Sequence, residues 1–123
     1  MSLLRWFTKN WANTTEPTHA DLQPLRLPGP LSEVAARLKT AGGTLRGWRL
    51  ETESADALHF IRRTRVFRFA DDIRVTFQGE GDGVRVGAES RSRLGKGDFG
   101  QNRRNILELW AAATPATSAV PPA

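Results

Sequence analysis

The sequence predicts an α+β domain of two layers, in which a four-stranded antiparallel meander carries an N-terminal and a C-terminal helix on one face. Three observations lead to this fold class. Apolar residues recur with helical spacing at both ends of the central region, apolar and polar residues alternate between those ends, and short turns join the alternating segments. Short connections favour antiparallel neighbours, and the apolar face of such a sheet needs helices to cover it. The length of 123 residues fits one domain.

The first predicted element is a helix over residues 30–43. Its apolar residues with i, i+3, i+4, i+7 spacing are Leu31, Val34, Ala35 and Leu38. Pro30 suits a first helical position, and Gly42 suits the C-terminal cap. Residues 1–29 are assigned to a separate N-terminal part. It consists of an amphipathic segment and a connector that is rich in proline and lacks a periodic apolar run.

Four strands are expected after this helix. The first covers residues 44–53, with Trp48 and Leu50 as its apolar anchors, and the second covers residues 57–64. Residues 71–77 and 83–93 alternate between apolar and polar positions, which is typical of half-buried strands.

Matching the apolar faces of the last two strands predicts their register. The expected pairs are Phe77 with Val84, Val75 with Val86, Ile73 with Ala88, and Asp71 with Ser90. Asp71 therefore falls on the apolar face, where a carboxylate needs hydrogen-bonding partners.

The last element is a helix with Asp98 as its N-cap and Gln101 completing a capping box. Its predicted buried stripe consists of Phe99, Ile106, Leu109, Trp110 and Ala113. The folded domain thus covers residues 30–113. Residues 114–123 are small, Pro-rich and uncharged, so they are expected to be disordered.

Charge is concentrated in one part of the chain. The formal net charge is +5, and residues 60–104 hold eleven Arg or Lys against six Asp or Glu. A basic segment attracts nucleic acid, anionic lipid or an acidic protein. Because acids are interleaved with the bases, an Arg-rich solvated face with internal ion pairs is favoured. The absence of cysteine excludes disulfides, and two histidines are too few for a His-rich metal site.

The N-terminus lacks the features of a signal peptide, and no apolar run is long enough for a transmembrane helix, so a cytoplasmic location is expected. Residues 1–11 are nevertheless amphipathic. Leu3, Leu4, Phe7 and Trp11 share one helical face. This segment is expected to dock on its own domain or a partner, with peripheral membrane contact as the alternative.

The string GKGDFG, residues 95–100, matches the dinucleotide fingerprint G-x-G-x-x-G. The match is rejected because no strand follows the next helix, so there is no βαβ unit. The acid expected about 20 residues later is also missing, since the chain there is a Pro-Ala tail. No cofactor is therefore expected.

The blocks FRFADDIRV and SRSRLGKGDFGQNRRNI resemble the DUF1499 family, a domain of unknown function. The resemblance covers about residues 31–110. The positions that match its C-terminal motif are Ser90, Ser92, Arg93, Gly95, Asp98, Gly100, Asn102, Arg103, Arg104 and Ile106. The upstream acidic pair matches at Asp71 and Asp72. Asn105 stands where the family commonly has another arginine, and the family supplies no established reaction.

The motif residues allow three roles. In the favoured one, arginines pair with the two aspartates and fasten helix to sheet, with Arg103 or Arg104 reaching Asp71 and Arg91 diagonal to Asp72. In the second, arginines and helix N-terminal amides form an anion pocket. In the third, Asp71 or Asp72 acts as a general base. The residues of the candidate site are Asp71, Asp72, Ser90, Arg91, Ser92, Arg93, Gly95, Asp98, Asn102, Arg103 and Arg104.

The leading function is a non-enzymatic module that binds an anionic small molecule or an acidic protein. An enzyme with an Asp/Arg site is the first alternative. Nucleic-acid binding by the Arg-rich sheet face is the second alternative. This binding is expected to be weak, since that face has no aromatic stacking residues or RNA-binding signature string.

Overall fold

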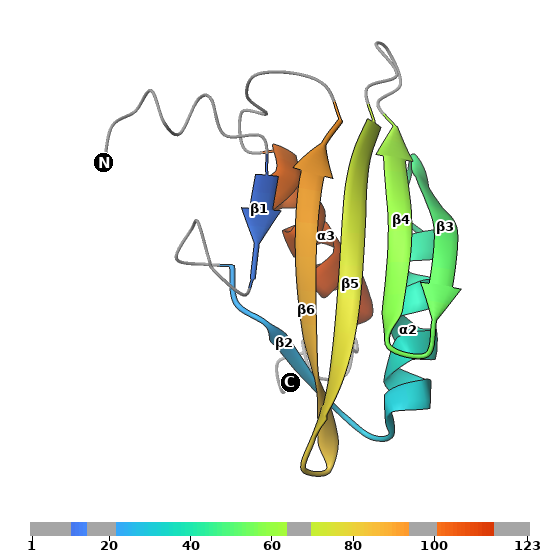
Figure 1. Cartoon of the computed structure of the whole chain (residues 1–123), viewed down its shortest axis with the longest axis vertical. Coiled ribbons are helices and arrows are strands. Elements are labelled where there is room, and N and C mark those ends of the chain that lie inside the picture. The colour runs from blue at the N-terminus through green and yellow to red at the C-terminus, as the bar shows by residue number, and fades with distance from the viewer. Residues whose placement is uncertain (1–10, 15–21, 64–69, 94–100, 115–123) are drawn as a thin grey trace, which may run out of the picture.

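The computed structural model of the chain describes residues 11–14, 22–63, 70–93 and 101–114 (Figure 1). The elements in chain order are β1 (Trp11–Asn13), β2 (Leu25–Pro28), α2 (Leu31–Gly43), β3 (Trp48–Ser54), β4 (Ala57–Arg63), β5 (Ala70–Glu80), β6 (Gly83–Ser92) and α3 (Gln101–Ala113). Neither described helix is long and apolar enough to cross a membrane.

The strands form one antiparallel sheet in the order β1-β6-β5-β4-β3, and β2 also pairs with β6. The predicted α+β class, antiparallel sheet and two helices are confirmed. The predicted four-stranded meander is wrong, because the sheet has six strands. Both additional strands come from the N-terminal region, and they pair with different parts of the same edge of β6 (Figure 1).

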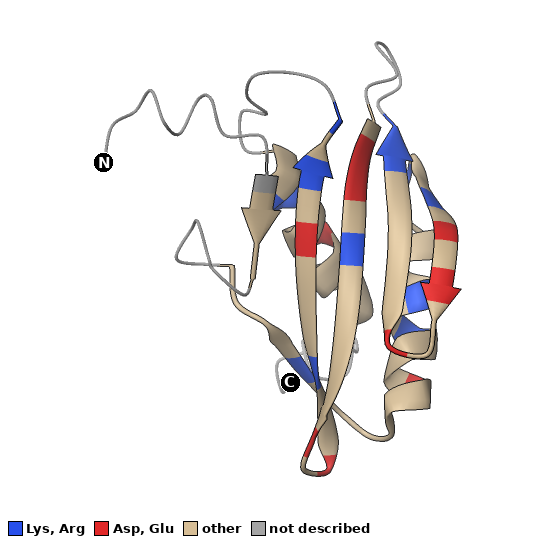
Figure 2. Cartoon of the chain, in the orientation of Figure 1, with Lys and Arg blue, Asp and Glu red and all other residues tan. Residues whose placement is uncertain are grey.

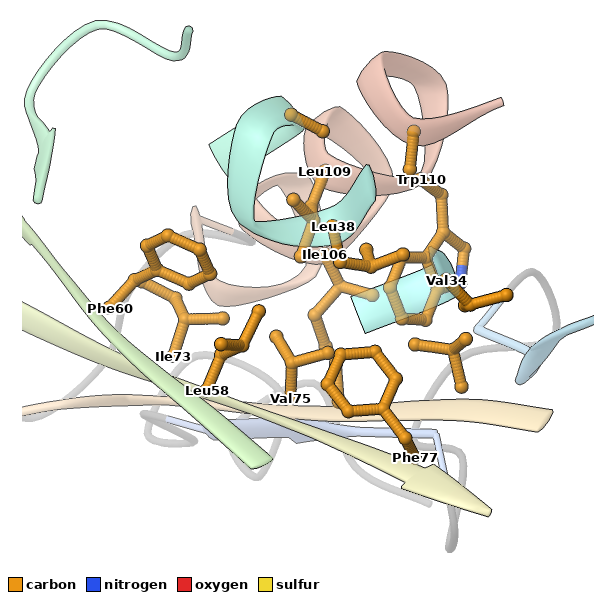
Figure 3. Close-up of a cluster of buried hydrophobic side chains, with 14 of the residues drawn as sticks. Val34, Leu38, Leu58, Phe60, Ile73, Val75, Phe77, Ile106, Leu109 and Trp110 are labelled. Carbon is orange, nitrogen blue, oxygen red and sulfur yellow. The ribbon is translucent and has the colours of Figure 1, made fainter. Parts of the chain in front are cut away.

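The two helices lie side by side on one face of the sheet, and the hydrophobic core fills the space between them and the strands (Figure 3). Alternate residues of β5 point into this core. Ile73, Val75 and Phe77 are buried, whereas the intervening Arg74 and Thr76 are exposed. The face that carries the core is called the inner face below, and the opposite face is called the outer face.

The helices meet the core through the predicted stripes. Val34 and Leu38 of α2 are fully buried, and so are Ile106 and Leu109 of α3. Trp110 adds an anchor beyond the core, because its indole Nε1 donates to the backbone oxygen of Gln23 at 2.8 Å. This hydrogen bond ties the C-terminal helix to the segment that leads into β2.

Gly42 does not have the capping role that the sequence suggested. Thr44 is the C-cap of α2. Its backbone N–H bonds to the oxygen of Ala41, and the N–H of Leu45 bonds to the oxygen of Gly42. Gly42 itself lies inside the last helical turn and is buried. A Cβ at this position would come within 2.5 Å of Cε1 of Phe60, so the missing side chain lets α2 pack directly on the ring.

The register of the β5–β6 hairpin differs from the predicted one by two residues. Val75 pairs with Ala88 and Asp71 pairs with Ser92. The strands continue to Glu80 and Gly83, so the connection is a tight two-residue turn in which Gly81 has a φ of 65°. A shift of two residues keeps every side chain on its face, and apolar alternation cannot detect it.

Several predictions concern residues outside those that the structure describes. They include the amphipathic helix as far as residue 10, the cap at Asp98 and the tail after Thr114. Trp11 is described, and it belongs to β1, so the expected helical face does not extend to it. Thr114 directly follows α3, and its N–H and its hydroxyl both donate to the oxygen of Trp110.

Candidate functional site

The predicted site residues of β5 and β6 lie at the end of the sheet where β4 and β6 end and β5 begins (Figure 1). The sheet separates them into two groups. The inner cluster consists of Asp71, Ser90, Ser92 and Asn102, together with Asn105 of α3. The outer cluster consists of Asp72, Arg91 and Arg93, together with His59 of β4.

The inner cluster is a chain of side-chain hydrogen bonds between α3 and the sheet. Nδ2 of Asn105 donates to Oδ2 of Asp71 at 2.8 Å and to Oγ of Ser90 at 3.1 Å. Ser90 donates to Oδ1 of Asn102 at 2.6 Å, and Nδ2 of Asn102 donates to Oγ of Ser92 at 2.9 Å. These bonds satisfy polar groups that the apolar core could not accommodate otherwise.

Burial leaves the inner cluster little access to a ligand. Asp71 is only 5% exposed, and Ser90, Asn102 and Asn105 are completely buried. Both amide hydrogens of Asn105 are engaged, and its Oδ1 accepts from Gln101 at 2.7 Å. The inner cluster therefore fastens α3 to β5 and β6, as the favoured prediction held. It does so through asparagine amides where an arginine from α3 was expected.

The outer cluster centres on the carboxylate of Asp72. Nε and Nη2 of Arg93 donate to its two oxygens at 2.8 and 2.9 Å, which is a bidentate pair. Nε2 of His59 lies 2.7 Å from Oδ1 of the same carboxylate. Arg91 is directly opposite Asp72 in the corrected register, although its described ion pair is with Glu89 at 3.9 Å.

These contacts shift the pKa values of Asp72 and Arg93. The guanidinium of Arg93 lowers the pKa of Asp72 below its ordinary value, and His59 contributes to the same shift. The carboxylate of Asp72 in turn raises the pKa of Arg93. A carboxylate whose pKa is lowered is a weaker base, so these contacts oppose a general-base role for Asp72.

Two buried donors next to the inner cluster have no partner among the described residues. They are Nε1 of Trp48 and the guanidinium of Arg62, in which Nε and Nη1 are buried. Trp48, Arg62 and Asp71 are neighbours in register on the inner face. Asp71 accepts from Asn105. Arg62 is a half-buried side chain whose Nε and Nη1 are shielded from water, and it has no paired anion in the described part of the chain.

Arginines outnumber acids on the outer face by register, and Figure 2 marks the charged residues along the strands that carry them. The arginines that register and contacts place on it are Arg26, Arg49, Arg63, Arg74, Arg85, Arg91 and Arg93. The acids that β5 and β6 place there are Asp72, Glu80 and Glu89, and ion pairs with Arg49 and Arg26 add Glu51 and Asp82. Arg63 and Arg74 are exposed, and no other described residue forms an ion pair with either.

Sequence reasoning missed two residues of these clusters. His59 was treated only as part of a strand, although its place in β4 puts it on the same face as Asp72. Asn105 was noted only as a departure from the family motif. Its spacing from Asn102 and Ile106 places it on the buried side of α3, and a buried asparagine needs hydrogen-bonding partners.

The remaining candidate residues fall into two sets. Gly95 and Asp98 lie outside the described residues. Arg103 and Arg104 are in the first turns of α3, where Arg104 donates to Oε1 of Gln101 at 3.0 Å. Within the described ranges, no group of three His, Cys, Asp or Glu side chains is placed to hold a metal ion.

Comparison with known proteins adds a family and a fold neighbour. The family described as "Protein of unknown function (DUF1499)" matches residues 7–112, which is most of the chain. None of the curated proteins matches. The crystal structure of CalU16 from Micromonospora echinospora has a TM-score of 0.50 over 89% of this chain and 87% of its own, at 12% identity. At that identity the likeness concerns the fold alone.

Proposed function

The chain belongs to the DUF1499 family of proteins of unknown function, and we propose that it is a non-enzymatic module whose outer sheet face binds an acidic segment of a partner protein. The observation that carries this proposal is the charge of that face. Seven arginines stand there. The acids are Asp72, Glu80 and Glu89 of β5 and β6, together with Glu51 and Asp82, which form ion pairs with Arg49 and Arg26. Both described helices lie on the other side of the sheet.

The arginines differ in how much they are available. Arg93 is ion-paired with Asp72, and Nε of Arg26 lies 3.3 Å from Oε1 of Glu80. Arg63 and Arg74 are exposed and have no ion pair with another described residue, so their charge is available to carboxylates of a partner. Ion pairs at the rim of such a face mainly increase the association rate and depend on salt.

Two features favour an acidic protein over nucleic acid. The outer positions of β4, β5 and β6 hold no Phe or Trp on which a base could stack. Asp72 and Glu89 also interrupt the arginines, and they would repel a continuous phosphate backbone. An acidic peptide can place its carboxylates between these acids because its charges are spaced by neutral residues.

Fluorescence anisotropy with labelled hexaglutamate tests this function, with hexaglutamine as the uncharged probe. We expect the double variant R63A/R74A to bind hexaglutamate about tenfold more weakly than the parent at low salt, because two unpaired cations are lost. The control R37A/R46A removes the same charge from exposed positions on α2 and before β3. It should bind within about twofold of the parent.

Comparing the two double variants tests whether the position of the arginines matters for peptide binding, as well as their charge. Equal losses in the two double variants would mean that net charge alone attracts the peptide, and would overturn the proposed site. A third arm uses duplex DNA at about 0.15 M salt, where non-specific binding is normally weak. Tighter binding of DNA than of hexaglutamate under that condition would replace the acidic partner with nucleic acid.

A further inference from the structure

The outer face contains a pocket of about 460 Å³ at Gly87, away from the Asp72 cluster. Its walls include Thr14, Pro24, Thr76, Gln78 and Arg85. The pocket exists because of how the edge of the sheet is built. β1 pairs with residues 89–91 of β6 and β2 pairs with residues 83–86, so the position of Gly87 lies between the two short strands.

Gly87 forms the floor of this pocket, which we call the Gly87 pocket. On the outer face of β6 the neighbouring side chains are Arg85 and Glu89, and Gly87 between them has none. A Cβ there would lie 3.2 Å from Oγ1 of Thr76 and 3.4 Å from Oγ1 of Thr14. Any larger side chain would therefore fill the space that the pocket now offers.

The polar side chains around the pocket can each donate a hydrogen bond, and one of them, Arg85, is a cation. Arg85 has only a long contact of 3.9 Å with Glu80, and its side chain is 52% exposed. The side chains of Thr76 and Gln78 form no hydrogen bond with another described residue, whereas the hydroxyl of Thr14 already bonds to both backbone groups of Ala88. The walls contain no Asp or Glu, so an anion is favoured.

We propose that the Gly87 pocket binds a small organic molecule with one carboxylate, which pairs with Arg85 and accepts hydrogen bonds from Thr76 and Gln78. Arginine forms bidentate pairs with carboxylates, and Gln78 is directly opposite Arg85 in the register. Pro24 and Phe77 give the pocket apolar surface for the rest of such a molecule. The volume falls within the range of small-ligand sites, about 300–1,000 Å³.

This inference does not rest on the proposed function, because it uses neither Arg63 nor Arg74. Benzoate is a suitable probe, with neutral benzamide as its matched control and inorganic phosphate as the competing anion. NMR titration of the ¹⁵N-labelled chain is expected to shift the amide signals of Thr76 and Gly87 with benzoate. We expect benzamide and phosphate to bind at least about tenfold more weakly.

Substitutions in the Gly87 pocket test whether benzoate binds there. R85M removes the guanidinium and T76V removes one hydroxyl donor, both at exposed positions, and each should weaken benzoate binding by about tenfold or more. G87V should abolish it by filling the space. The control G79A adds a methyl group to β5 where no atom lies within 4 Å, and it should bind like the parent.

Two results would overturn the inference. One is benzoate binding that R85M and T76V leave unchanged, and the other is phosphate binding as tight as that of benzoate. The variant R63A/R74A should bind benzoate normally. The outcome at the pocket is therefore distinguishable from failure of the acidic-partner site.

Discussion

The contact between Gly42 and Phe60 allows a sharp test of how α2 packs on the sheet. Replacing Gly42 by alanine adds one methyl group at a buried position. The new Cβ would lie 2.5 Å from Cε1 and 3.0 Å from Cε2 of the Phe60 ring. Phe60 is completely buried and contacts Trp48 edge-to-face, with ring centroids 5.6 Å apart, so it has little room to move.

The expected magnitude follows from two opposing effects. Alanine is favoured over glycine within a helix by up to about 1 kcal/mol. Forcing a methyl group into a packed core costs about 1–3 kcal/mol. The adjacent Gly43 is a matched control, because it is in the same helical turn and an added Cβ would meet no atom within 4 Å. G43A should therefore stabilise the protein slightly, while G42A destabilises it.

Urea denaturation followed by tryptophan fluorescence measures both variants. We expect G42A to be less stable than G43A by about 1–3 kcal/mol, which is the packing cost alone because the helical gain is common to both. Each 1 kcal/mol corresponds to about 4–8 °C in Tm for a domain of about 60–100 residues. If G42A proved as stable as G43A, the close approach of α2 to Phe60 would be refuted.

Three further predictions concern charged residues, and urea midpoints measure all of them. Asp71→Ala should destabilise the fold by about 2–4 kcal/mol, because it leaves the buried donor of Asn105 unpaired. Asp72→Ala should cost less than about 1 kcal/mol, since the ion pair of Asp72 with Arg93 is partly solvated. Equal urea midpoints for the two variants would contradict the assignment of faces. The lowered pKa of Asp72 means that its carboxylate stabilises the folded state at any pH above its unfolded-state pKa of about 4. This stabilisation is lost as the pH falls through the folded-state pKa. The stability difference between the parent and Asp72→Asn should thus shrink as the pH falls below about 4, and a difference that kept growing there would have the wrong sign. Arg62→Met should leave stability unchanged or raise it by about 1–2 kcal/mol, because it removes a half-buried cation without a described partner. A clear loss of stability would show that Arg62 is paired.

Apolar alternation determined which face each residue of β5 and β6 occupies, and Asp71 was correctly placed on the buried side. Alternation has a period of two residues, so it could not distinguish the observed register from one shifted by two. The turn at Gly81 decides between them, and its two-residue length was not evident among several glycines and acids. Turn geometry therefore carried the information that the hydrophobic pattern lacked.

The two N-terminal strands were missed for a related reason. β1 has three residues and β2 has four, which is too short for a periodic pattern, and β2 ends in a proline. Gly42 illustrates the opposite difficulty, because its position at a helix end suggested a cap while its actual role depends on Phe60, a residue of β4. Contacts between distant segments decided both cases, and local sequence does not contain them.

The candidate site was predictable in composition but not in arrangement. Asp71 and Asp72 were expected to face opposite ways, and they do. Which donor reaches each carboxylate depends on the docking of α3 and on the true register of the hairpin. Asn105 therefore took the place expected for an arginine at Asp71, and Arg93 became the principal partner of Asp72.

The pairing of β1 and β2 with β6 also affects how the chain resists self-association. Unpaired strand edges are templates for strand addition and aggregation, and long, flat, apolar edges are the most hazardous. Two short strands cover the edge that β6 would otherwise expose along its ten residues. At the other side of the sheet, β3 is interrupted by a bulge between Leu50 and Thr52, and exposed charges such as Glu51 flank the irregularity. A second copy would meet a kinked and charged edge there, which disfavours growth of a continuous sheet from copy to copy.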